Sequence, residues 1–537
     1  MVTAHGPWVS WTPYDPVVRR LAGPVIDRAG ILHACVLVAG FLVAAAVGFV
    51  LVRPIAASPV GYDTAGSVLY FQRIVHGQLL EQPYGATPKA AMTVIDGLLF
   101  ALFGWAGISL AAVAASAAVV TLGAELVRRV AGPAAGIFAF IALLGSQPLL
   151  LDESLAYAVS WASLFLLFAA FAVRSERPRY AVIGVCLGIA TLCRLEAVVV
   201  LVGAVGVVAG WALLGTRLGT RLGNRVGVQA MPRRAWLVAL GLLAIPIMLL
   251  HDWLLIRNPF YWASVSANYS ARAGDTLRSP VEIVLWLARH YAGMPLLLVL
   301  ACLGAVLLVR RREYGVALGL ALTGPGIGVL LVVMAGRGTY VSARYAYLMD
   351  LAVTIVAAIG FATVRVPEVS GTFRRHARAG TVFALGMSVV VATAASTPFA
   401  LLDPATRRSV ATQRTVAQNI RAVEPLIRKD LQSGGTASGS GPILIAPGLW
   451  TPRLIVGLRL LIPDVAVPKF DASGDSYAAG LLRAGQIVYH DRIGDPANGL
   501  ATAMEAGGPV RAGAYTLIPE ASDEAAGWWL FRVAAGS

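Results

Sequence analysis

The stretch RPIAASPVGYDTAGSVLYFQRIVHGQLLEQPYGATPKAAMTVIDGLLFALFGW, residues 53–105, decides how the chain is organised. It follows the first long apolar run and is too polar at its start to cross a membrane. From Asp63 to Leu80 apolar residues recur at helical spacing, and from Lys89 to Trp105 runs a strongly apolar segment interrupted by Asp96. Both patterns predict helices that lie in the membrane interface and do not cross it. Asp63 and Lys89 then start two helices on the same membrane face.

The composition predicts a polytopic membrane protein. The 537-residue chain is 58% hydrophobic and 13% charged, which excludes an ordinary soluble globular protein. The net charge of +15 comes from arginines in short loops between apolar runs, so it indicates orientation in a lipid bilayer and no nucleic-acid partner. All four cysteines lie inside apolar runs, which is typical of helix packing and not of disulfides or a metal site.

Eleven apolar runs are near the spanning length of about 20 residues. We predict spans at 31–52, 108–127, 133–150, 155–173, 180–194, 196–215, 235–254, 291–309, 315–335, 346–364 and 380–398. Residues 1–30 read as a cytoplasmic N-terminal segment without a removable signal peptide.

Loop charge decides whether 89–105 is an additional span. If it stays on the outer face, the arginine clusters of alternate loops all fall on the cytoplasmic side with the N-terminus, as the positive-inside rule requires. If it crossed, the later clusters would all be external. These clusters are Arg128/Arg129, Arg174/Arg177/Arg179, Arg217–Arg234, Arg310–Arg312 and Arg365–Arg378. The sequence therefore predicts a multi-pass protein of the cytoplasmic membrane with an extracytoplasmic C-terminal part.

The C-terminal part changes character after the last span. Residues 401–441 read as an amphipathic connecting helix and a Gly/Ser linker, followed at 442–537 by a small α/β domain. We expect strands at 442–447, 463–468, 487–490 and 528–533, and helices at 481–485 and 498–506. No phosphate loop or nucleophile motif occurs there. The domain is expected to bind an acceptor or to stabilise the protein, and to be dispensable for turnover of a donor.

Polar residues gather at one face of the predicted bundle. A charged residue at the end of a span can simply snorkel to the interface. Here the span centres are almost free of ionisable residues, which favours a site at the outer face over a transport path through the midplane. The polar outer segments are the loop 53–107, Asp152 with Glu153, Arg194 with Glu196, His251 and Asp252 with the loop 255–290, and Arg337–Tyr345.

Five segments resemble the GT-C glycosyltransferases, in particular the branch of protein O-mannosyltransferases and aminoarabinose transferases. They are GYDTAGSVLYFQRIVHGQ (61–78), PYGATPKAAMTVIDGLLFALFG (83–104), LDESLAY (151–157), GIATLCRLEAVVVL (188–201) and GRGTYVSARYAYL (336–348). The resemblance covers residues 31–400 and implies an all-α, GT-C-like membrane domain with about eleven transmembrane helices, interfacial helices in the loop 53–107, and a C-terminal extracytoplasmic domain. It departs from the mannosyltransferase pattern at Thr64, where that branch has Glu after the Asp.

The resemblance implies transfer of a sugar, mannose or arabinose-like, from a polyprenyl-phosphate donor to a glycan, lipid or protein acceptor. Inverting transfer needs a base for the acceptor hydroxyl, and Asp63 is the candidate. Partial desolvation at the hydrocarbon boundary is expected to raise the pKa of the Asp63 carboxyl. The alternatives are that Asp63 caps its helix or is a plain exposed acid.

The leaving phosphate needs cations, for which Lys89, Arg194, Arg337 and Arg344 are the candidates. Candidate substrate-binding residues are Asp152, Glu153, Tyr345 and His251. No cofactor is indicated with certainty; a divalent metal at the acidic pair stays open, because no His/Asp spacing is diagnostic. Two other functions remain alternatives, namely a polysaccharide polymerase or ligase that uses lipid-linked glycans, and a secondary transporter.

Overall fold

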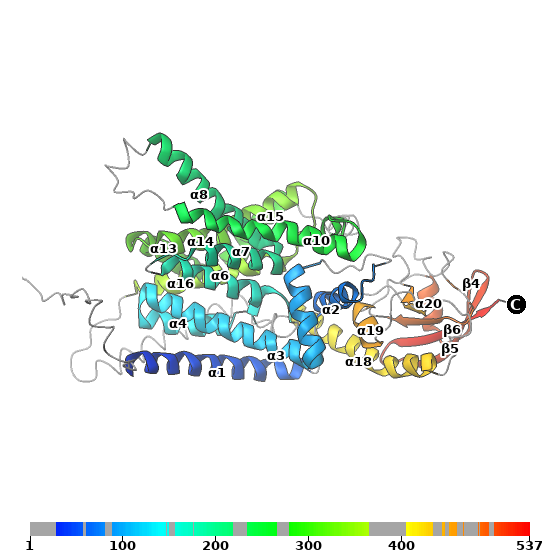
Figure 1. Ribbon diagram of the computed structural model, residues 1–537. Helices are drawn as coiled ribbons and strands as arrows, with labels where there is room; N and C mark the ends of the chain where they lie inside the picture. The colour runs from blue at the N-terminus through cyan, green and yellow to red at the C-terminus, as the bar shows by residue number, and fades with distance from the viewer. Residues whose placement is uncertain are drawn as a thin grey trace, which may run out of the picture.

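The computed structural model combines a helical bundle with a C-terminal α/β domain placed beyond one end of it (Figure 1). We call this end the domain end of the bundle. The structure describes residues 28–56, 61–80, 88–146, 148–149, 156–175, 177–218, 233–265, 279–364, 404–432, 443–445, 451–458, 465–466, 482, 484–492 and 499–536.

The bundle is built from α-helices joined by short 3-10 and π segments. In chain order these are α1 (Arg28–Ala56), α2 (Tyr62–Val75), α3 (Ala90–Ala131), α4 (Pro133–Leu144), α6 (Val159–Arg174), α7 (Tyr180–Cys193), η2 (Leu195–Ala197), α8 (Val198–Leu218), η3 (Arg233–Leu243), α10 (Ala244–Ile256), α12 (Pro280–Ala292), α13 (Pro295–Arg310), α14 (Tyr314–Ala321), η5 (Leu322–Gly326), α15 (Ile327–Gly336), η6 (Ala343–Ala346) and α16 (Tyr347–Phe361).

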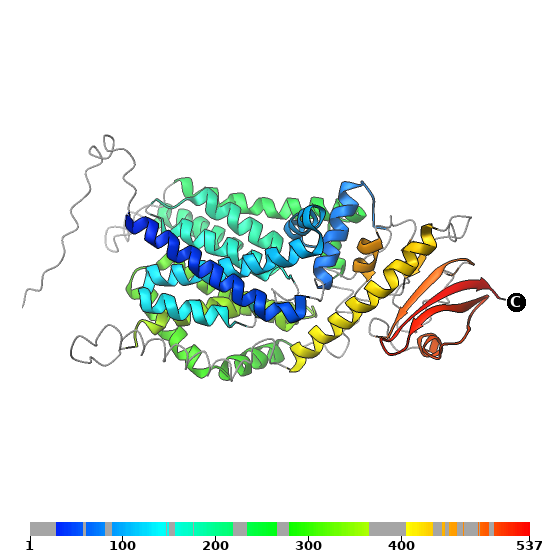
Figure 2. The same cartoon turned by 90° about the horizontal axis from the view of Figure 1, so that it is seen from below.

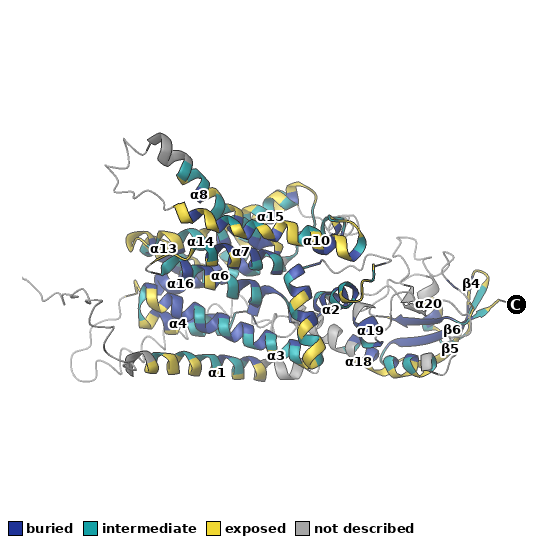
Figure 3. Ribbon diagram, in the orientation of Figure 1, coloured by how far each residue is buried: buried dark blue, intermediate teal, exposed yellow. Residues whose placement is uncertain are grey.

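The predicted membrane-spanning segments coincide with helices. Within the described ranges, six helices are long and apolar enough to cross a membrane, or seven if the bent pair α12–α13 is one span, and three further apolar helices are shorter. Each predicted span up to residue 364 overlaps one of these helices, whereas the predicted span 380–398 lies outside the described residues. Exposed apolar side chains line the outside of α1, including Leu32, Val36 and Leu42 (Figure 3). Such a surface suits contact with lipid and not with water.

Gly104 divides the long helix α3 into two parts. Its φ of 64° and ψ of −161° are non-helical and of a kind that favours glycine. The segment 90–103 therefore forms the predicted interfacial helix, and 105–131 forms the span. Helix α2 packs closely on the first part, because a Cβ on Gly97 would lie only 2.0 Å from the ring of Phe71.

Contacts at the opposite end of the bundle show that residues 89–105 do not cross it. His33, near the start of α1, lies 3.2 Å from the carboxylate of Glu125, near the end of α3. Arg174 donates to Glu313 at 2.8 Å and to the carbonyl of Arg129 at 3.0 Å. The arginine-bearing ends of α3, α6 and α13 are thus together with the start of α1, as the charge pattern predicted.

The predicted loop 255–290 is wrong in its last part, because residues 280–292 form α12. This helix begins with a capping box, in which Ser279 accepts from the backbone of Glu282 and the Glu282 side chain accepts from the backbone of Ser279. A 95° bend separates α12 from α13. The Ser-Pro-x-Glu sequence is a local start signal that the hydrophobicity pattern alone did not reveal.

The C-terminal domain contains one mixed six-stranded sheet with the strand order β2-β1-β3-β6-β5-β4. Strand β1 is parallel to β2 and β3, and the remaining pairs are antiparallel. Its elements are α18 (Pro404–Gln432), β1 (Ile443–Ile445), α19 (Thr451–Leu458), β2 (Val465–Ala466), β3 (Ile487–Asp491), α20 (Gly499–Glu505), β4 (Val510–Ala512), β5 (Tyr515–Asp523) and β6 (Trp528–Ala535).

The four predicted strands and the helix at 498–506 are confirmed. The helix predicted at 481–485 is wrong, since Ala484 and Gly485 form a turn that leads into β3. Helix α19 and strands β4 and β5 were not anticipated. Strand β5 contains Pro519, next to a bulge, and a proline inside a run is a signal against a strand.

Helices α18 and α19 lie between the sheet and the bundle (Figure 2). One face of the sheet has its own core around Trp529 and Phe531. The other face shares a core with α18, α19 and α2, in which Leu69 of α2 and Ile455 of α19 are at most 1% exposed. The C-terminal domain is therefore packed onto the interfacial helix that carries Asp63.

Candidate active site at the domain end of the bundle

Asp63 and Lys89 form an ion pair, although 26 positions separate them in the chain. Helix α2 starts after Gly61 and places Asp63 in its first turn, while Lys89 is the extended residue immediately before α3. The Lys89 ammonium donates to Asp63 Oδ2 at 2.9 Å. The alternative that Asp63 caps α2 is wrong, because Gly61 is the N-cap residue and no side chain caps this helix.

Arg344 approaches the same carboxylate from η6, in the segment before α16. Its Nη1 lies 3.5 Å from Asp63 Oδ2, and its guanidinium lies 5.7 Å from the centre of the Tyr157 ring. Next to Asp63, the Thr64 hydroxyl donates to the carbonyl of Ala156 at 2.7 Å. Thr64 thus ties the start of α2 to the segment before α6.

Arg194 and Glu196 form a second, buried ion pair at the turn between α7 and α8. Two guanidinium nitrogens of Arg194 donate to the two Glu196 oxygens at 3.1 and 2.8 Å. The same guanidinium donates to the backbone carbonyl of Arg344 at 3.0 Å. This bidentate geometry is specific and rigid, so the pair holds η6, and with it Arg344, in place.

The charges around Asp63 determine its protonation state. Burial raises the pKa of the Asp63 carboxyl, but the nearby charges of Lys89, Arg344 and Arg194 together lower it far below its usual range. The expectation of a raised pKa is therefore wrong in its net sign. These cations therefore favour the ionised form of the carboxyl.

Three cations meet at this end of the bundle. Among the described residues, Lys89, Arg344 and Arg194 gather around two carboxylates, those of Asp63 and Glu196. Tyr345 follows Arg344 directly in η6. The arrangement can bind an anion while keeping its cations fixed.

His251 is near this cluster but is engaged in contacts of its own. Its two ring nitrogens lie 3.0 Å from the Thr93 hydroxyl and 3.1 Å from Asp252 Oδ1. Thr93 is in the first turn of α3, one turn after Lys89. Since His251 is buried with both nitrogens occupied, it fixes the start of α3 against α10.

The remaining predicted site residues are not brought into the cluster by the residues described. Arg337 is exposed at the end of α15 and makes no ion pair with any residue that the structure describes. Asp152 and Glu153 lie outside the described residues. Within those ranges, no three His, Cys, Asp or Glu side chains are close enough to hold a metal ion.

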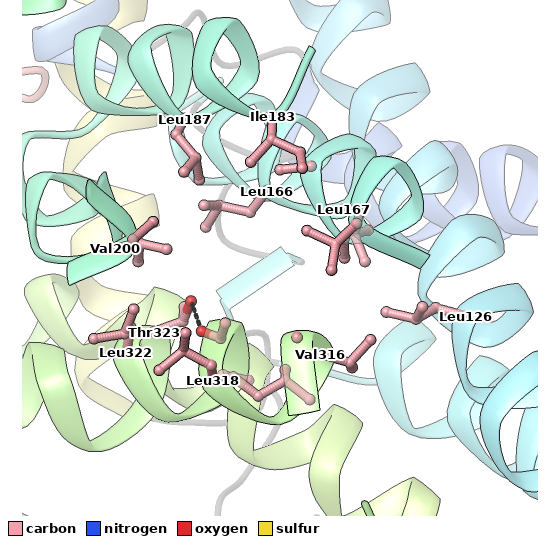
Figure 4. Close-up of a pocket in the computed structure, with 18 of the residues that line it drawn as sticks. Leu126, Leu166, Leu167, Ile183, Leu187, Val200, Val316, Leu318, Leu322 and Thr323 are labelled. Carbon is pink, nitrogen blue, oxygen red and sulfur yellow. Dashed lines mark hydrogen bonds between the residues drawn. The ribbon is translucent and has the colours of Figure 1, made fainter. Parts of the chain in front are cut away.

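An apolar cavity of about 310 Å³ lies within the bundle (Figure 4). Its walls come from α3, α6, α7, α8, α14, η5 and α16, and include Leu166, Leu187, Val200 and Leu318. Thr323 also lines it, but its hydroxyl donates to the carbonyl of Gly319 at 2.8 Å. Leu348 and Leu351 of α16 complete the wall directly after Tyr347. Helix α16 thus connects the charged cluster to an apolar volume.

The sequence drew attention to most members of this cluster but not to its aromatic wall. Tyr157 and Tyr347 were not candidates, because tyrosines at span ends are common interfacial anchors. Only their location could have indicated them, since both lie in segments that carry the GT-C resemblance.

Scans against known protein families and against curated proteins match nothing. The fold is similar to two solved structures of ArnT from Cupriavidus metallidurans, one bound to undecaprenyl phosphate and one in the apo state. The sequence identities are 16% and 15%, the TM-score is 0.50 in both, and each comparison covers 94% of this chain and 98% of that one. The similarity shows that the chain has the GT-C-type fold expected from the sequence.

Proposed function

We propose that the protein is a membrane glycosyltransferase that takes a sugar from a polyprenyl-phosphate carrier. The observation that carries this proposal is the cluster at the domain end of the bundle, where the cations Lys89, Arg344 and Arg194 gather around the carboxylates of Asp63 and Glu196. An anionic headgroup at a membrane surface is the ligand that such a site suits. The ArnT fold supports the proposal, because one ArnT structure holds undecaprenyl phosphate.

In the proposed reaction, the acceptor hydroxyl attacks the anomeric carbon of the sugar while the bond from that carbon to the phosphate oxygen breaks. The leaving phosphate develops negative charge, which Lys89 and Arg344 stabilise. Asp63 holds these two cations in position through contacts of 2.9 and 3.5 Å. Tyr157 and Tyr345 offer aromatic surface and hydroxyl groups to the sugar.

The apolar cavity gives the lipid part of the donor a place within the bundle. Its lining is mostly aliphatic and carries the hydroxyl-bearing residues Ser163, Tyr180 and Thr323, of which Thr323 donates to the carbonyl of Gly319. Isoprenoid units bury favourably in such surroundings, at about 25 cal/mol per Å² of apolar surface. We assign the cavity to isoprenoid units beyond those nearest the phosphate, because its lining extends along α16 from Leu348 to Ile355 and reaches Tyr180 at the start of α7.

The test is binding of undecaprenyl phosphate to purified protein, followed by release of radiolabelled sugar from polyprenyl-phosphate mannose and from the arabinose-type analogue. We expect Lys89→Met to weaken binding by about 10- to 100-fold, the loss of one charge-assisted contact of about 1.5–3 kcal/mol. Lys429→Met, at an exposed lysine on α18, is the matched control. Equal binding by both variants would reject the phosphate site, and binding without sugar release would favour a polymerase, a ligase or a transporter.

The orientation in the cytoplasmic membrane is part of the proposal. With the arginine-rich end inside, Lys89 and the C-terminal domain face the outside, where lipid-linked sugars are the available donors. A cysteine placed at Ala501, in a chain without its native cysteines, should react with an impermeant thiol reagent in intact spheroplasts. Reaction only after lysis would show that the orientation is opposite to the one proposed.

A further inference from the structure

A second cluster of titratable side chains lies where α12 meets α16, and the reaction described above does not use it. His290 Nε2 lies 3.0 Å from Asp350 Oδ1, and the Tyr291 hydroxyl donates to the same oxygen at 2.7 Å. The imidazole stacks on the Trp286 ring at 5.9 Å between centres and meets the Tyr291 ring edge-on at 4.9 Å. The imidazole is therefore fixed both in position and in orientation.

These contacts determine which ring nitrogen is available. Because a carboxylate only accepts hydrogen bonds, Nε2 of His290 carries the hydrogen, and Nδ1 of the neutral ring keeps its lone pair. The His290 side chain is 22% exposed and makes no other hydrogen bond among the described residues. A carboxylate in this relation orients an imidazole and stabilises the imidazolium that forms when the other nitrogen takes a proton.

The pair lies at the same end of the bundle as the phosphate-binding cations. Asp350 is on α16, three positions after Tyr347, so the two residues share a helix face. Arg344 is in η6, which leads directly into α16. Tyr347 begins α16 directly after η6, so in the chain it lies between Arg344 and Asp350.

Few other charged groups surround the imidazole. Helix α15, which packs against α12, has no titratable residue between Ile327 and Gly336, and α13 has only Cys302 before Arg310 at its far end. On α12 itself, Arg289 is exposed and Glu282 is in the first turn. Asp350 is thus the only carboxylate in contact with His290 in the part of the chain that the structure describes.

We propose that His290, oriented by Asp350, accepts the proton of the acceptor hydroxyl in the sugar transfer proposed above, on which this inference rests. The acceptor oxygen forms its bond to the anomeric carbon, the bond from that carbon to the phosphate oxygen breaks with its electron pair, and the proton passes to His290 Nδ1. A general base works best when its proton affinity matches the operating pH. An imidazole meets this condition near neutrality, whereas Asp63 is held ionised by the cations around it.

The kinetic test compares full-length wild type with His290→Gln and Asp350→Asn in proteoliposomes, measuring sugar release from the polyprenyl-phosphate sugar. We expect His290→Gln to lower release by about 100-fold, to abolish the fall in rate on acidification, and to leave the Kd for undecaprenyl phosphate within about twofold. Asp350→Asn should keep that fall in rate but move it to lower pH, because the imidazolium loses its carboxylate. His33→Gln, at the His33–Glu125 pair of the opposite end, is the control. A His290→Gln variant with wild-type release and pH profile would overturn the inference.

A chemical test does not depend on turnover. Diethyl pyrocarbonate attacks the lone-pair nitrogen of a neutral imidazole, so His290 should be modified increasingly between pH 5 and pH 7, as mass spectrometry of the peptides would show. The exposed His76 is the internal standard. An unmodified His290 beside a modified His76 would overturn the inference even for an inactive preparation. Absence of both phosphate binding and sugar release in wild type would instead reject the proposed function.

Discussion

Replacing Asp63 by Asn removes one negative charge from the cluster at the domain end and keeps the size of the side chain. The cluster becomes more positive by one charge, because Lys89 and Arg344 lose the carboxylate that they share. A phosphate bound to Lys89 would lie about 6 Å from Asp63, since the ammonium is 2.9 Å from the carboxylate and about 2.8 Å from a bound phosphate oxygen. At a dielectric constant of about 40, the repulsion over this distance is about 1.4 kcal/mol. We therefore expect Asp63→Asn to bind undecaprenyl phosphate about tenfold more tightly.

The effect on turnover separates the two roles considered for Asp63. If it only aligns the cations, release of sugar should fall by no more than about tenfold and should keep its dependence on pH. A proton acceptor would instead contribute about 10²- to 10⁴-fold, and its loss would remove the fall in rate on acidification.

The same substitution has a defined effect on stability. Burial raises the pKa of Asp63 and the neighbouring cations lower it more, so the folded pKa is below the unfolded value of about 3.9. A group with a lowered folded pKa contributes stability above the unfolded pKa and loses it as the pH falls through the folded pKa. The Asn variant should thus be less stable by about 3 kcal/mol at pH 7. That difference should shrink only below about pH 4.

Equilibrium binding in detergent and thermal unfolding at pH 7 and below pH 4 test these expectations. Glu313→Gln is the matched control, because it breaks a 2.8 Å ion pair with Arg174 at the opposite end of the bundle. Unchanged or weaker binding of the lipid phosphate by Asp63→Asn would refute the electrostatic reasoning. A loss of turnover above 100-fold with unchanged binding would make Asp63 the base.

Three further predictions concern the packing around the site. Ile455→Asp, at a fully buried position of α19 in the core shared with α2, should abolish lipid-phosphate binding, whereas Ile518→Asp at an exposed position should not; a folded Ile455→Asp protein with normal binding would show that the domain acts independently. Burial lowers the pKa of Arg453 to about 9, and its guanidinium lies 5.7 Å from the Trp105 ring, so Arg453→Met should remove a buried charge and match or exceed wild-type thermal stability; a marked loss would contradict this. Leu351→Trp should narrow the apolar cavity and weaken undecaprenyl phosphate binding about tenfold more than binding of a short isoprenyl phosphate. Equal effects on the two lipids would show that the isoprenoid chain binds outside this cavity.

The parts of the fold that depend on local signals could be predicted from the sequence. Hydrophobic run length gave the helices, and loop arginines showed that 89–105 stays at one end of the bundle. Asp63 and Lys89 could be predicted as neighbours from local signals too, because each residue starts an amphipathic segment at the same end of the bundle. Gly104 at the end of an apolar run indicated the break that φ and ψ at this position now show.

What depends on contacts between distant segments could not be predicted. The pKa of Asp63 is lowered by Lys89 and also by Arg344, which lies 281 positions further along the chain and whose backbone carbonyl accepts a hydrogen bond from Arg194. The His290–Asp350 pair could not be predicted, because the sequence pattern indicates a loop at 255–290 where the structure has α12. Hydrophobicity can show that a helix has an apolar face but not which element covers it.

Helix α2 shows why the C-terminal domain is more than an addition to the bundle. An isolated helix of its 14 residues would be marginally stable, and most helical stability in proteins comes from packing of an apolar face. Leu69 and Tyr70 of α2 are at most 1% exposed, in a core that contains Leu454 and Ile455 of α19. Since Asp63 is one to two turns from these residues on a short rigid helix, a displacement of α19 would also displace the carboxylate that aligns Lys89 and Arg344. The sequence-based expectation that the domain can be removed without loss of donor turnover therefore conflicts with the way that α2 is packed.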